Sequence, residues 1–137
     1  ETIEALIALS QEDPLVKLMV EHLEKVRHHL SEYACAPGTQ FDQSLRWLEG
    51  TKALERLATL EPSMPAAQVL LLRIKRESAD ALFRTACRLC IGQHWREACI
   101  LLEQVLKIEP DHRAAQEEYR RASKRWQRAR SRSLALS

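Results

Sequence analysis

The chain has little of what loops, sheets and membrane spans require. Of its 137 residues, three are glycine and five are proline, and aromatic residues make up 5%. It has no runs of the β-branched residues that strands favour. No apolar run approaches the length that crosses a bilayer, and no signal peptide is visible, so we expect no membrane span. With 45% hydrophobic residues, the composition predicts an all-α protein with few loops, forming a single domain over residues 1–137.

Apolar residues recur at the three- and four-residue spacing of amphipathic helices. The first ten residues look like the end of a helix, and Asp13 and Pro14 are suited to cap and start the next one. A loop is expected at 36–40, because proline and glycine break helices there. Gly50 need not end the helix that contains it. In all, about six helices are expected, over residues 1–10, 14–33, 41–60, 65–90, 95–108 and 111–131.

The stretch 79–112 has the pattern of two helices joined by a tight turn, an αα-hairpin. Gly92 lies between the two apolar stripes, where a helix end favours a residue that tolerates positive φ. Pro110 follows the second stripe and cannot continue it. Because one hairpin cannot bury both of its faces, this segment requires neighbouring helices.

These 34 residues resemble a tetratricopeptide repeat. The matching residues are the small Ala86 and Ala98, the large Leu89, the aromatic Trp95 and the closing Pro110. The departures are Leu82 where the family prefers Trp, Thr85 where it prefers Leu, Val105 where it prefers Ala, and a glycine one place early at Gly92. The resemblance implies an array of antiparallel helical hairpins that serves as a protein-binding scaffold.

A second copy of part of this pattern occurs 48 residues earlier. The residues Trp47, Gly50, Leu54, Leu57, Leu60, Glu61 and Pro62 match Trp95, Ala98, Leu102, Val105, Ile108, Glu109 and Pro110. We therefore expect a degenerate repeat over 14–62, and a second repeat over 65–110 with a lengthened first helix. That helix is expected to run from 65 to 90, the alternative being a break at 77–80. A basic helix over 111–132, with Asp111 as its candidate N-cap, is expected to close the array.

The resemblance also implies which residues face a ligand. They are Asp80, Phe83, Cys87, Cys90 and Ile91. This strip is mostly apolar and is suited to hold an amphipathic helix of a partner. The alternative is that the first three helices cover it. If the strip is exposed, self-association into a homo-oligomer is a further expectation.

Charge is distributed unevenly along the chain. The net charge is +2, but residues 113–137 hold eight Lys or Arg and two Glu, so this segment carries +6 and the rest −4. One face of the last helix carries Arg121, Lys124, Arg125, Arg128 and Arg132. Three interpretations stay open: a solvated helix face, a site for an acidic protein partner, or a site for nucleic acid or an anionic membrane.

The four cysteines raise the question of a metal site. Cys87, Cys90, His94 and Cys99 supply ligand types that suit tetrahedral zinc, and a zinc-binding module is one alternative. The helical register opposes it, because a zinc knuckle needs irregular, glycine-rich backbone. We expect no metal and no cofactor. Cys35 and the other thiols instead behave as small buried hydrophobes, which favours a reduced, cytoplasmic setting.

No arrangement of catalytic residues is visible. The chain has no glycine-rich phosphate loop, no nucleophile elbow and no HExxH. His22, His28 and His29 lack the spacing of a metal pair and are expected to be surface or snorkelling histidines, with His22 also filling the middle turn of the apolar stripe over 14–33. The sequence therefore predicts a non-catalytic adaptor that binds a partner protein, with nucleic-acid binding through the basic helix as the alternative.

Overall fold

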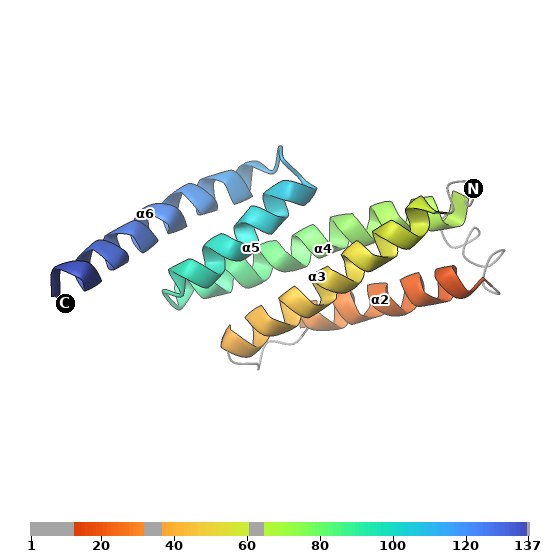
Figure 1. Ribbon diagram of the computed structural model, residues 1–137, viewed down its shortest axis with the longest axis horizontal. Helices are drawn as coiled ribbons and strands as arrows, with labels where there is room; N and C mark the ends of the chain where they lie inside the picture. Colours follow the sequence, from red (N-terminus) through yellow and green to blue (C-terminus); the bar gives the residue numbers. More distant parts are fainter. Residues whose placement is uncertain (1–12, 32–36, 61–64, 137) are drawn as a thin grey trace.

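The fold is all-α, and a computed structural model describes residues 13–31, 37–60 and 65–136 (Figure 1). The predicted helix at 1–10, and residues 32 and 33 of the second predicted helix, lie outside these ranges. The described helices are α2 (Pro14–Ser31), α3 (Pro37–Thr59), α4 (Pro65–Ile91), α5 (Trp95–Ile108) and α6 (Arg113–Leu136). Among them, none combines the length and the hydropathy needed to cross a membrane.

Helix α4 is the central element of the fold. It is continuous from Pro65 to Ile91, so the break considered at 77–80 does not occur. At 1.5 Å per residue it is about 40 Å long. On one side it packs against α2 and α3, and on the other against α5 and α6 (Figure 1). Its length allows it to contribute to two separate parts of the core.

The core divides into two clusters along α4. Toward the N-terminal end of α4, Leu70 and Ile74 pack with Met19 of α2 and Leu54 of α3. Toward its C-terminal end, residues 79–89 of α4 pack with α5, with Trp47 and Leu48 of α3, and with the first half of α6. Every described helix therefore buries an apolar face against at least one neighbour.

The helix starts agree with the sequence in one place and correct it in two. Asp13 caps α2 as predicted, because its Oδ1 accepts hydrogen bonds from the amides of Leu15 (2.9 Å) and Val16 (3.4 Å). The expected loop at 36–40 is wrong from Pro37 onward, since α3 begins there; proline is well suited to the first position of a helix. At α6 the cap is His112 and not Asp111: the His112 Nδ1 accepts the Ala115 amide at 3.1 Å.

The turn between α4 and α5 corrects the expectation for Gly92. The left-handed residue is Gln93, with φ of 62°, and Gly92 has no positive φ. The His94 amide bonds the Leu89 carbonyl at 2.8 Å, and the Gln93 amide bonds the Cys90 carbonyl at 3.0 Å. This is the Schellman arrangement, which usually places glycine where Gln93 lies. The tight turn therefore forms although its glycine is one residue early.

Candidate functional site

The five residues of the predicted ligand-facing strip do not form one open apolar surface. The Phe83 ring lies against His112, with centroids 4.8 Å apart. Asp80 is exposed and pairs with Arg84, whose Nη2 lies 3.5 Å from the Asp80 Oδ2. Ile91, at the end of α4, is 84% exposed. Among the described residues, His112 at the start of α6 therefore lies against one residue of the strip.

The thiols of this region are held in their neutral form. Burial, and then the negative charge of Glu118 on α6, raise the pKa of Cys90 to about 11 and raise that of Cys87. Burial also raises the pKa of Cys99 on α5. Within the described ranges, no group of three or more His, Cys, Asp or Glu side chains could hold a metal ion.

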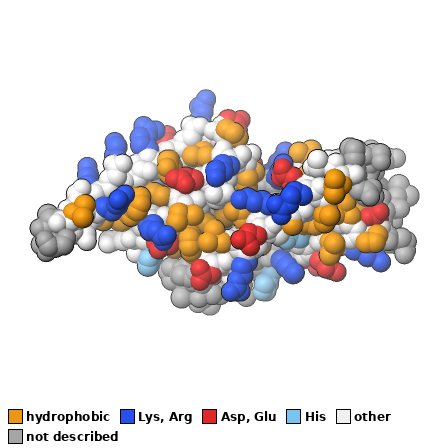
Figure 2. Space-filling model, viewed as in Figure 1, with side chains coloured by type: hydrophobic (Ala, Val, Ile, Leu, Met, Phe, Trp, Pro, Cys, Tyr) orange, Lys and Arg blue, Asp and Glu red, His pale blue; other side chains and the backbone are white. Residues whose placement is uncertain are grey.

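The basic face of α6 is open to solvent. Arg121, Lys124, Arg125, Arg128 and Arg132 are all exposed. Figure 2 shows Lys and Arg side chains along the edge of the molecule that α6 forms. The structure therefore leaves this predicted site accessible.

The second half of α6 extends past the start of α5 (Figure 1). Residues 127–134 are exposed throughout. No Asp or Glu occurs after Glu118, so the seven Lys and Arg between Arg120 and Arg132 outnumber the acidic residues near them, although Arg121 pairs with Glu118, with its Nη1 3.1 Å from Oε1.

The aromatic side chains near this face are engaged with the rest of the molecule. The Tyr119 hydroxyl donates to Glu103 Oε1 at 2.8 Å, and this bond is the main cause that raises the pKa of Tyr119. The Arg130 guanidinium lies 4.8 Å from the centroid of the Trp126 ring, and that of Arg125 lies 5.9 Å from the centroid of Trp95. Cation–π contacts of this kind occupy the ring faces on which a base would otherwise stack.

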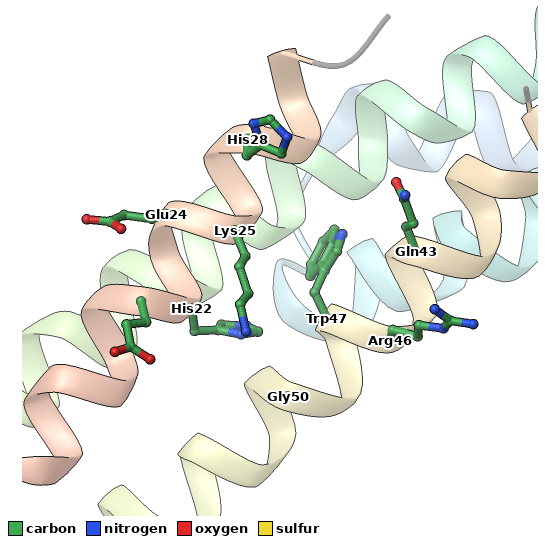
Figure 3. Close-up of a pocket in the computed structure, with 9 residues that line it drawn as sticks. His22, Glu24, Lys25, His28, Gln43, Arg46, Trp47 and Gly50 are labelled. Carbon is green, nitrogen blue, oxygen red and sulfur yellow. The ribbon is translucent and has the colours of Figure 1, made fainter. Parts of the chain in front are cut away.

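Helices α2 and α3 enclose a groove of about 790 Å³ (Figure 3). His22, Lys25 and Trp47 point toward its interior, whereas Glu24 and Arg46 point away from it (Figure 3). Acidic and basic residues both line the groove, so it has no strong preference for a charged ligand.

His22, which lines this groove, lies on the buried apolar stripe of α2 and not at the surface. It is buried, and its Nε2 lies 2.7 Å from the Thr51 hydroxyl. Because that hydroxyl donates its proton to the Trp47 carbonyl at 3.0 Å, Nε2 of His22 carries the proton of the 2.7 Å bond. Burial, with a smaller effect of Lys25, lowers the pKa of His22. The ring is thus a neutral structural donor that joins α2 to α3.

A second groove, of about 760 Å³, lies between α3 and α5. Sequence analysis did not find it, because its basic residues come from segments far apart in the chain. The one local signal was the spacing of Lys52 and Arg56, which places both on the same face of α3.

No family model, curated protein or solved structure matches the chain.

Proposed function

We propose that this chain is a non-catalytic adaptor module that binds an acidic partner protein through the basic face of α6. The observation that carries the proposal is the run of seven Lys and Arg between Arg120 and Arg132, which lies on an exposed helix and has no acidic residue beyond Glu118. Such a field attracts acidic surfaces and accelerates encounter with them.

The proposed architecture is a tetratricopeptide-like array of helical hairpins, in which α4 and α5 form the best-preserved repeat and α6 closes the array. Its support is the packing of the small residues: Ala86 and Ala98 are fully buried, as a close approach of two helices requires. In that architecture the free thiols of Cys87, Cys90 and Cys99 are part of helix packing. They favour a reducing, cytoplasmic location.

An acidic protein is favoured over nucleic acid as the partner of α6. Single-stranded nucleic acid is bound by basic grooves that also offer aromatic faces for stacking. Here Trp126 lies beneath Arg130, and Tyr119 is tied to Glu103. What α6 offers is guanidinium groups, whose planar donors match carboxylates in pairs.

The test is a pull-down at two salt concentrations from a lysate of the source cells, with and without nuclease treatment. The variant carries Arg121→Glu, Lys124→Glu, Arg125→Glu and Arg128→Glu. A matched control carries the same change in charge on other exposed residues, namely Lys17→Glu, Lys25→Glu, Arg46→Glu and Arg76→Glu.

We expect one set of proteins to be retained by the wild type and the control and lost by the α6 variant. Retention should weaken at high salt, because exposed charges are screened. Capture that disappears on nuclease treatment would replace the protein partner with nucleic acid. Equal capture by all three proteins would show that α6 is only a solvated cap.

A further inference from the structure

We infer that the groove between α3 and α5 is a second binding surface, and that its occupant is an acidic amphipathic helix of a partner protein. The groove is distinct from the basic face of α6, because α5 lies between α3 and α6 (Figure 1). The inference does not depend on the function proposed for α6.

The groove has an apolar component supplied by both of its walls. Leu48, which is almost fully buried, and half-buried Ile108 contribute from α3 and α5. Leu60, at the end of α3, lines the same groove and is 78% exposed. Leucine and isoleucine side chains that line a groove gain stability when an apolar face covers them.

The rim of the groove is positively charged. Lys52 and Arg56 on α3 and Lys107 on α5 line it and are exposed. The acidic residue among the described lining residues is Glu55, and its Oε2 lies 3.0 Å from the Nζ of Lys75. That pair neutralises itself, so the rim retains the positive charge of the other three cations. Figure 2 also shows Lys and Arg side chains over α3.

A groove with apolar walls and a positively charged rim matches an acidic amphipathic helix. An amphipathic helix places apolar residues at i, i+3 and i+4 on one face and polar residues beside them. Lys52 and Arg56 are one helical turn apart, about 6 Å between their Cβ atoms, which is also the spacing of two carboxylates at i and i+4 on a facing helix. Apolar contacts then supply affinity, and the paired charges supply orientation.

A nucleic acid fits this groove less well. Its phosphates would meet the basic rim but leave the exposed apolar surface of Leu60 and Ile108 uncovered. None of the described lining residues is aromatic, so the groove offers no face on which a base could stack. A peptide with an apolar face and acidic flanks satisfies both components.

The experiment is selection from a display library of helical peptides, about four turns long, whose surface positions sample acidic, basic and apolar residues. The target is the full chain. We expect the enriched peptides to be acidic, with apolar residues at helical spacing. Binding of an enriched peptide, measured by fluorescence anisotropy, should weaken roughly tenfold or more in Lys52→Glu/Arg56→Glu, because like charges then face each other.

Two controls make the result specific to the groove. The conservative variant Lys52→Arg/Arg56→Lys should retain binding, which would show that positive charge at these two positions is sufficient. The variant with four charge reversals on α6 should bind the peptide within about twofold of wild type, because those residues lie outside the groove. Loss of the function proposed for α6 would leave this result unchanged.

Several outcomes would overturn the inference. They are enrichment of basic or neutral peptides, a library that yields no binder, and peptide binding that survives Lys52→Glu/Arg56→Glu. Displacement of the peptide by an oligonucleotide, with the same dependence on Lys52 and Arg56, would assign the groove to nucleic acid instead.

Discussion

Helices α3 and α5 carry the same pattern of residues 48 positions apart, yet they bury it differently. In α5 the buried stripe runs through Ala98, Leu102 and Val105, each fully inaccessible. In α3, Leu57 is 44% exposed although it occupies the position that matches Val105. The shared sequence pattern therefore does not produce a shared environment in the last turns of the two helices.

The cause of this difference is the helix that follows each one. The first turns of α4 place Ala66 and Ala67 in the same core cluster as Ala58, so α3 buries Ala58 where α5 buries Val105. The side-chain amide of Gln68 also donates to the Ala58 carbonyl at 3.0 Å. With the buried stripe turned by one residue, about 100°, Leu57 faces outward.

The comparison can be tested most strongly at Leu102. Leu102→Ala should lower the free energy of unfolding by about 2–5 kcal/mol, because it removes a fully buried side chain and leaves a cavity. Leu57→Ala, at the position of α3 that matches Val105, should cost less than about 1 kcal/mol, since the side chain is 44% exposed already. Urea denaturation followed by circular dichroism measures both. Similar losses at the two positions would contradict the difference in burial.

The next largest destabilisation is expected at Gly50, the position of α3 that matches Ala98 of α5. A Cβ at Gly50 would lie 2.8 Å from Cε1 of His22, and the ring cannot retreat without losing its bond to Thr51. Gly50→Ala should therefore destabilise the protein by about 1–3 kcal/mol, despite the better helix propensity of alanine. Thermal and urea unfolding measure the change.

Its control uses the partner residue. In a His22→Ala background the added methyl group has room, so Gly50→Ala should cost much less there, and the double-mutant cycle should show coupling between the two sites. If Gly50→Ala lowers the free energy of unfolding equally in both backgrounds, the contact with His22 is not the reason that residue 50 must be glycine. At the matching position, Ala98→Gly should also destabilise α5, through the backbone entropy of glycine.

The smallest effect is the pH dependence that His22 confers on the α2–α3 contact. Its pKa is lowered in the folded protein, so the unfolded chain binds the proton more readily. Neutral His22 therefore contributes its full stabilisation of the folded protein above the ordinary histidine pKa of about 6.5. That contribution is lost as the pH falls through the lower pKa that His22 has in the folded protein. Unfolding free energies measured from pH 7.5 to pH 5 should fall more steeply for the wild type than for His22→Gln. Identical slopes would show that His22 does not titrate between the two states.

Local features of the fold were readable from the sequence. The spacing of apolar residues predicted the helices, Asp13 and Pro14 marked the start of α2, and the absence of breakers between 65 and 90 predicted one long α4. Gly50, matched with Ala98, indicated a close approach of helices, and the distance from Gly50 to His22 confirms it. These features depend on residues that are near one another in the chain.

The errors share a different origin. The loop expected at 36–40 weighed Pro37 and Gly38 as breakers, but proline also begins helices, and α3 starts there. His22 was expected to be a surface or snorkelling histidine because its burial depends on Thr51, which is 29 residues away. The contact of Phe83 with His112, 29 residues further along the chain, was likewise not readable from local spacing.

By itself the sequence determined the all-α class, the approximate helix boundaries, the repeated pattern and the positive charge of the last helix. Periodicity, capping and composition act over one or two turns and can be read along the chain. The tertiary structure alone decided which copy of the pattern is buried, where His22 finds its hydrogen-bond acceptor, and how Lys52, Arg56 and Lys107 come to line one groove. Those outcomes depend on how α4 packs against four other helices, and no local segment encodes that arrangement.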